Sequence, residues 1–244
     1  MPDALSRLET LATAYKYLTG AQDVVDGLRK VKAFAKKNPK NLSEAKKILG
    51  LAKDKYKPLK DFFSKTQTEV LAAAKEGFPP IPDPTSEARK RMEKIAKSKG
   101  PNSPGFEKEL TIYIKLLQKY EYELRERMSY MKLVTTKCDL NIKNFTLMNQ
   151  IIDGTMIALK AVFVAIPEAQ TAAGSEILQI MKAGIEKHPR AVANAYRKLK
   201  ATAQAHEKDV KRDQVYAKAA LKKACDKKLK FVMEDAKAFF KKLF

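Results

Sequence analysis

The 244-residue chain has few residues that break helices and contains no tryptophan. Its 9 Gly and 11 Pro fill 20 positions, which is below the usual combined share of about 12%. All-β folds depend on many turns built from Gly and Pro, so this scarcity argues against them and favours helices. Hydrophobic residues make up 45% of the chain, enough for a real core, which argues against wholesale disorder.

Cysteine is also scarce. Cys138 and Cys225 are the two cysteines, and neither has a second Cys or a His at the spacing of a zinc site. Two cysteines in a chain of this length do not form a disulfide framework. We therefore interpret both as ordinary thiols of a reducing compartment, and we expect no metal and no cofactor.

Catalytic motifs are missing as well. The chain has no Gly-rich phosphate loop, no nucleophilic Ser elbow and no H-E-x-x-H motif. His206, Asp209 and Asp213 share one helical face, but the basic residues around the aspartates favour a charge-paired surface over a metal site. We expect a protein that is not an enzyme. A small toxin-like nuclease that uses His188 or His206 remains an alternative.

Long hydrophobic runs are absent. The first twenty residues alternate charged residues with Leu and lack the basic start and apolar run of a signal peptide. No stretch of 18 apolar residues occurs, which predicts that no ordinary transmembrane helix is present. We expect a cytoplasmic protein, although a leaderless export route would leave no trace in the sequence.

The patterns that are present predict an all-α fold, an elongated multi-helix bundle with two long helices flanking an apolar helical hairpin. Residues 1–77 carry short amphipathic stripes typical of an N-terminal helical subdomain. Residues 78–105 form a Pro- and Gly-rich linker that carries a short basic helix. Residues 106–244 form the C-terminal helical bundle.

The two long helices are predicted from different signals. From Phe106 to Met131 apolar residues recur at spacings of four and three, the mark of a helix packed along another helix. Residues 132–141 weaken this pattern with β-branched side chains, so we expect a break there. Residues 190–244 contain neither Pro nor Gly and predict the second helix. Its apolar stripe is thin over residues 201–217, where a bend or an exposed, homodimer-forming surface would fit.

The hairpin at residues 144–187 allows two interpretations. Only Asp153 and Lys160 are charged between Asn144 and Pro167, and a helix that is apolar nearly all round is normally a buried, central one. The alternative is a membrane-active effector or toxin, because the layout is similar to that of some helical pore-forming toxins with a sheltered apolar hairpin. In that case the inserting face would comprise Ile152, Met156, Leu159, Phe163 and Ile166.

The excess of positive charge is the strongest functional signal. The chain has 49 Lys and Arg against 28 Asp and Glu, a net charge of +21, and residues 190–244 contribute +10 of it. Basic clusters at residues 30–60, 89–99 and 218–242 indicate an anionic partner. The residues expected to bind it are Arg89, Lys90, Arg91, Lys94, Lys222, Lys223, Lys227 and Lys228.

These signals predict a non-enzymatic protein that binds an anionic polymer such as nucleic acid, or an acidic membrane surface, through Lys-rich faces. An acidic protein would satisfy the same charges. Lys predominates over Arg, and aromatic residues are sparse within the clusters, which argues against recognition of specific bases and against stacking.

Overall fold

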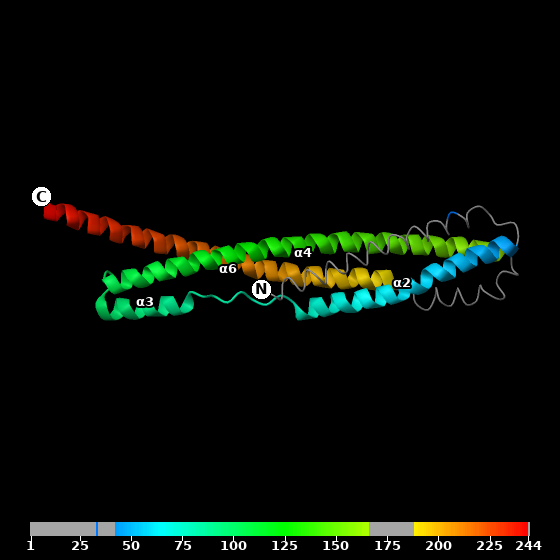
Figure 1. The fold of residues 1–244 in the computed structure, drawn as a ribbon, viewed down its shortest axis with the longest axis horizontal. Helices are drawn as coiled ribbons and strands as arrows, with labels where there is room; N and C mark the ends of the chain where they lie inside the picture. The colour runs from blue at the N-terminus through cyan, green and yellow to red at the C-terminus, as the bar shows by residue number, and fades with distance from the viewer. Residues whose placement is uncertain (1–32, 34–41, 166–187, 244) are drawn as a thin grey trace. The chain divides into compact units, whose positions relative to one another are not determined.

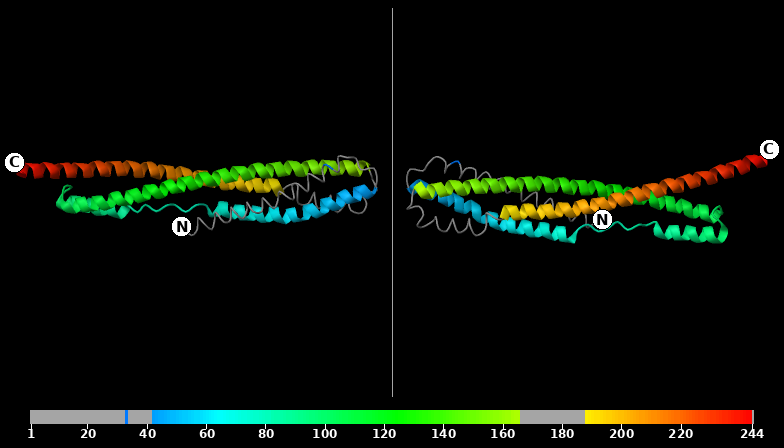
Figure 2. Two further views of the ribbon diagram at one scale, coloured as in Figure 1. Left: turned by 45° about the horizontal axis from the view of Figure 1, so that its top comes forward. Right: turned by 180° about the vertical axis from the view of Figure 1, so that it is seen from behind.

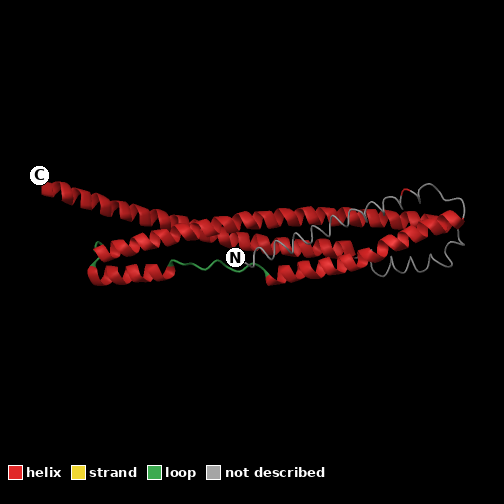
Figure 3. Ribbon diagram, viewed as in Figure 1, coloured by secondary structure: helices red, strands yellow, loops and turns green. Residues whose placement is uncertain are grey.

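The computed structural model describes residue 33, residues 42–165 and residues 188–243. These residues form the helices α2 (Leu42–Glu76), α3 (Ser86–Lys99), α4 (Pro104–Ala165) and α6 (His188–Leu243) (Figure 1). No strand occurs among them (Figure 3), so the all-α fold is confirmed for this part of the chain. The stripes expected in residues 1–32 and the second limb of the hairpin at 166–187 lie outside the described residues.

Loop residues set where the helices begin and end. Gly77 follows α2 with a φ of 68°, and its N–H donates to the carbonyl of Ala73 at 3.1 Å. This left-handed conformation is one that glycine adopts without steric cost. Pro104 is the first residue of α4, where a backbone N–H would have no partner within the helix, so the N–H that proline lacks is not needed. The carbonyl of Ser103 accepts a hydrogen bond from the N–H of Phe106 at 2.9 Å.

Helix α4 runs without a break through residues 132–141, so the expected interruption is wrong. Val134, Cys138 and Asn141 continue the spacing of four and three through this stretch, and all three are buried. Burial of a continuous stripe outweighs the small loss of helix propensity from two threonines and a valine. One 62-residue helix therefore contains both the first long pattern and the first limb of the expected hairpin.

The chain packs into two compact units, each made of two separate segments. Unit 1 comprises residues 1–77 and 135–202, and unit 2 comprises residues 78–134 and 203–244. Helices α4 and α6 each contribute residues to both units. The division into the consecutive segments 1–77, 78–105 and 106–244 stays a prediction. In the structure, each compact unit combines two segments that are far apart in the chain.

The core of unit 1 is built around aromatic rings contributed by α2, α4 and α6. The ring of Phe145 on α4 lies 6.1 Å from that of Phe63 on α2 and 5.9 Å from that of Tyr196 on α6, measured between centroids. All three side chains are fully buried. Edge-to-face and offset arrangements of this kind add to the stabilisation from area burial.

Part of the core of unit 2 is a seam, a line of packed side chains between α4 and α6. On α6, Ala203, Val210 and Ala217 recur every seven residues and are all buried, so the thin stripe is a packed seam and the expectation of an exposed surface there is wrong for these positions. Val210 and Ala217 pack with Tyr120 and Leu124 of α4. Small residues on α6 leave room for the larger side chains of α4, which explains why a sparse apolar stripe is enough here.

Candidate anion-binding surface

Charge is distributed unevenly within unit 2. Residues 86–120 and 217–243 carry 18 Lys and Arg against 7 Asp and Glu, a net charge of +11. Residues 121–134 and 203–216 carry 6 of each, a net charge of zero. We call the first set the basic end of unit 2 and the second set its neutral part. The basic end thus holds more than half of the chain's +21.

One hydrophobic cluster holds the basic end together. Ala88 and Met92 of α3 pack with Phe106 and Leu110 of α4, and the same cluster takes in Ala224 and Phe231 of α6. Three helices thereby meet on the first turns of α4. The basic residues expected on α3 and on α6 are brought to the same end of unit 2, although more than a hundred residues separate them in the chain.

The cations of α3 differ in what surrounds them. Arg89 donates to the hydroxyl oxygen of Tyr216 on α6, with 2.6 Å between Nη1 and Oη. Arg91 pairs with Glu109 of α4 at 3.1 Å and with Glu87 at 3.8 Å. Local groups therefore already occupy both arginines. Lys90 and Lys94 are exposed, and neither forms an ion pair with another described residue.

On α6 the four lysines expected to bind anions point to different sides. The Nζ of Lys227 lies 4.1 Å from the ring centroid of Phe106, and that of Lys228 donates to the hydroxyl of Thr111 at 3.0 Å. A helix with 3.6 residues per turn places these two neighbours on either flank of the buried seam, so both are half-buried. Lys222 and Lys223 are exposed.

Further exposed lysines on α6 were missed as individual site residues. Lys230, Lys237 and Lys241 are exposed, and none forms an ion pair with the part of the chain that the structure describes. They follow Lys223 by 7, 14 and 18 residues, which puts all four near one side of the helix. This periodicity is the signal in the sequence that could have identified them.

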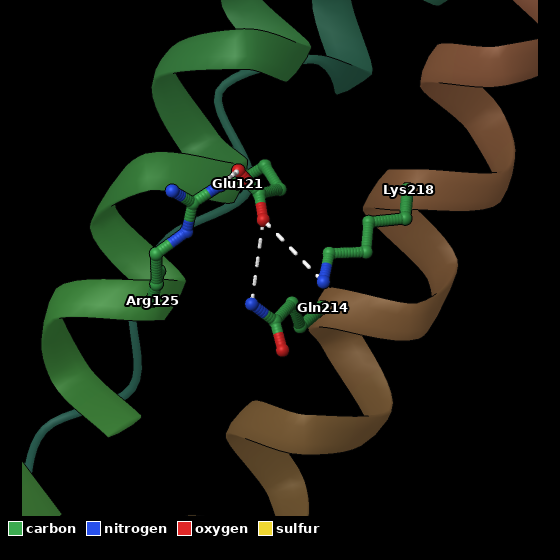
Figure 4. Close-up of polar contacts among 4 residues, drawn as sticks. All are labelled: Glu121, Arg125, Gln214 and Lys218. Atoms are coloured by element: carbon green, nitrogen blue, oxygen red, sulfur yellow. Dashed lines mark hydrogen bonds and ion pairs between the residues drawn. The ribbon is translucent and has the colours of Figure 1, made fainter. Parts of the chain in front are cut away.

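A buried carboxylate marks the border between the basic end and the neutral part. Glu121 of α4, only 7% exposed, accepts hydrogen bonds from Arg125 at 2.8 Å and from Gln214 of α6 at 3.3 Å (Figure 4). Lys218 lies 3.7 Å away from the same carboxylate. These contacts fix the register of α6 on α4, and they engage the charge of Lys218.

The two histidines lie in different units. In unit 2, the ring of His206 stacks on Phe78 with 5.7 Å between centroids, and its buried Nε2 has no hydrogen-bond partner among the described residues. Burial lowers the pKa of His206 and Arg127 adds to this, while Asp209 and Asp213 oppose it. His188 is the first residue of α6, in unit 1. The contacts of His206 are those of a packed side chain.

The residues expected in a membrane-inserting hairpin belong to unit 1. Ile152, Met156 and Phe163 are buried core residues there, while the side chain of Leu159 and all of Ile166 lie outside the described residues. Asp153 accepts a hydrogen bond from Asn149 at 2.8 Å. None of the helices in the described ranges combines the length and the hydropathy that crossing a membrane requires.

Neither a search for metal ligands among the described residues nor a comparison with known proteins points to a function. Within residues 42–165 and 188–243 no group of His, Cys, Asp and Glu side chains is arranged to hold a metal ion. No family model, curated protein or solved structure matches the chain. The function is therefore inferred from the geometry and charge of the molecule itself.

Proposed function

We propose that the basic end of unit 2 is a non-enzymatic binding surface for an anionic, phosphate-bearing partner. The observation that carries the proposal is the segregation of charge, +11 at the basic end beside a neutral part of similar helices. Clustered lysines attract a polyanion and release its counterions on contact. Lysine ammonium groups act as point charges on flexible stems, which suits a surface of phosphates better than the recognition of particular bases.

The availability of these charges supports the proposal. Lys90, Lys94, Lys222 and Lys223 are exposed and form no ion pair with the described residues. Binding a phosphate at these positions therefore breaks no ion pair with the residues that the structure describes. Arg89 and Arg91 have partners within unit 2, so they contribute to the local potential more than to direct contacts.

The test compares two double variants of α6 that change the net charge equally. Lys222→Gln with Lys223→Gln removes two exposed charges from the basic end, and Lys208→Gln with Lys211→Gln removes two exposed charges from the neutral part. Lys227 and Lys228 are left intact because they contact Phe106 and Thr111 of α4. Replacing them would mix a loss of packing with a loss of charge.

Binding is measured to two probes, vesicles that contain an acidic phospholipid and a DNA duplex, at low and at moderate salt. We expect the basic-end variant to lose about 30-fold in affinity, because each lysine near an acidic surface contributes about 1 kcal/mol. The neutral-part variant should change several-fold less. The proposal fails if the wild type binds neither probe in low salt, or if both variants lose affinity equally.

A further inference from the structure

Helix α6 continues beyond Phe231, which is the last buried residue among the α6 side chains that the structure describes. The ring of Phe231 lies 6.2 Å from that of Phe106, the third residue of α4. The helix then runs on to Leu243, and its C-terminal part extends past the first turn of α4 in every view (Figure 1 and Figure 2). We call residues 229–243 the projecting end.

Large apolar side chains of the projecting end are exposed. Leu229 is 60% exposed, and Val232 and Met233 are each 53% exposed. With the exposed Ala236 they stand at positions i, i+3, i+4 and i+7, which is one continuous face of a helix. This face lies on the side of α6 away from Phe231, so it is separate from the core that α6 shares with α4.

Lysines flank this apolar face. Lys230, Lys237 and Lys241 are exposed and recur at spacings of seven and four, which lines them up beside the apolar face. A helix with an aliphatic stripe next to a lysine stripe has the pattern of helices that lie in the interface of an acidic membrane. The aliphatic side chains enter the boundary of the acyl chains while the ammonium groups meet the phosphates of the headgroups.

Two other occupants fit this face less well. A nucleic acid would gain little from the exposed Leu229, Val232 and Met233, because aliphatic side chains neither neutralise phosphates nor offer an aromatic ring on which bases stack. A second copy of the chain could cover the aliphatic face. However, residues 217–243 have a net charge of +6, so pairing two of them would bring like charges together.

We infer that the projecting end lies in the interface of an acidic phospholipid membrane, with Leu229, Val232 and Met233 entering the acyl boundary. This inference rests on the proposed function, because the basic end supplies the long-range attraction to an anionic surface. It adds the class of partner, a lipid surface, and a contact of a different kind, the burial of aliphatic side chains.

The experiment removes the aliphatic contact and leaves every charge in place. The test variant carries Leu229→Ser, Val232→Ser and Met233→Ser. The control carries Ile157→Ser, Val164→Ser and Val215→Ser, three exposed aliphatic residues elsewhere on α4 and α6. Sedimentation is measured with vesicles of phosphatidylcholine alone and with added phosphatidylserine, and binding to a DNA duplex is measured in parallel.

We expect the test variant to lose at least about tenfold in binding to the acidic vesicles, while the control stays close to the wild type. Binding to the duplex should be the same for all three proteins, because none of these substitutions changes a charge. Neutral vesicles should bind weakly throughout, since lysines at an acidic surface supply part of the affinity.

Cys225 gives a second readout that needs no substitution. It is exposed and stands one turn before Leu229, on the same side of α6. Acidic vesicles should slow the reaction of Cys225 with a water-soluble maleimide in the wild type. Unchanged reactivity at vesicle concentrations that bind the protein would contradict the inference, even if the serine variant failed to fold.

The outcomes separate this inference from the proposed function. Equal vesicle binding by the test variant and the wild type, or binding of the duplex without binding of vesicles, overturns the lipid contact and leaves the anion-binding surface standing. If the wild type forms dimers, the test variant does not, and vesicles bind neither protein, the aliphatic face contacts a second copy of the chain instead. A wild type that binds neither probe refutes the proposed function itself.

Discussion

At the scale of single residues, the two cysteines provide a simple check of the packing. Cys138 is fully buried, and burial, with a smaller contribution from Asp139, raises the pKa of its thiol to about 12. Cys225 is exposed. Because the thiolate is the reactive form, we expect one thiol per chain to react with a disulfide reagent in the native protein and two after denaturation. Rapid reaction of two thiols per chain in the native state would contradict the buried position of Cys138.

His206 predicts a dependence of stability on pH. Its pKa in the folded state is lowered from 6.5, so the unfolded chain binds the proton more tightly. The stability that neutral His206 supports is therefore complete above 6.5 and is lost as the pH falls through the folded pKa. We expect the melting temperature to fall between about pH 7.5 and about pH 5.5 by less in His206→Phe than in the wild type. Equal falls would show that His206 does not contribute.

Glu121 predicts the effect of a buried carboxylate. Replacing Glu121 by Ala removes the acceptor of hydrogen bonds from Arg125 and Gln214, and we expect the free energy of unfolding to fall by about 1–3 kcal/mol. Glu123→Ala is the matched control, because its pairing with Lys119 at 3.8 Å is exposed and should contribute about 0.5 kcal/mol or less. Urea denaturation of both variants measures the difference.

At the scale of the helices, the same substitution at two adjacent residues of α4 should have a large effect at one and little effect at the other. Phe163 is 4% exposed and Val164 is 83% exposed. Phe163→Asp places an unpaired charge in the core of unit 1 and should lower the free energy of unfolding by roughly 4 kcal/mol or more. Val164→Asp should change it little. Similar decreases in the two variants, measured by thermal denaturation, would show that this part of α4 is not packed as described.

The periodicity of the sequence was sufficient to predict the long helices, but not that the first of them continues into the first limb of the expected hairpin. The spacing from Phe106 to Met131 predicted the first part of α4, and the lack of Pro and Gly after Pro189 predicted α6. Local propensity suggested a break at residues 132–141, whereas the structure buries Val134 and Cys138 there. A buried stripe stabilises a helix more than individual propensities weaken it.

The candidate site was predictable as a concentration of charge but not in its details. Composition identified the basic clusters of α3 and α6, because a count of Lys and Arg needs no geometry. Which lysines are available depends on the flank of α6 that faces α4, and that is a tertiary property. Lys227 and Lys228 therefore turned out to contact Phe106 and Thr111, while the stripe that includes Lys230 and Lys237 was missed.

At the scale of the whole molecule, a net charge of +21 is itself less informative than its distribution. Unit 2 gathers +11 at its basic end, and the adjoining parts of α4 and α6 are neutral. On a lysine-rich surface that contacts only solvent, concentrating charge in this way is unfavourable, since like charges repel one another. The segregation is the feature that an anionic partner explains.

The dependence of binding on salt tests the central claim, that the basic end binds the anion. The logarithm of the binding constant should fall linearly with the logarithm of the salt concentration, because counterions are released wherever a lysine neutralises a phosphate. The Lys222→Gln, Lys223→Gln variant should bind more weakly and with a shallower slope, by up to about 0.9 for each phosphate that is no longer neutralised. The Lys208→Gln, Lys211→Gln variant should keep the slope of the wild type. Equal slopes for all three proteins, or no binding at low salt, would contradict the account.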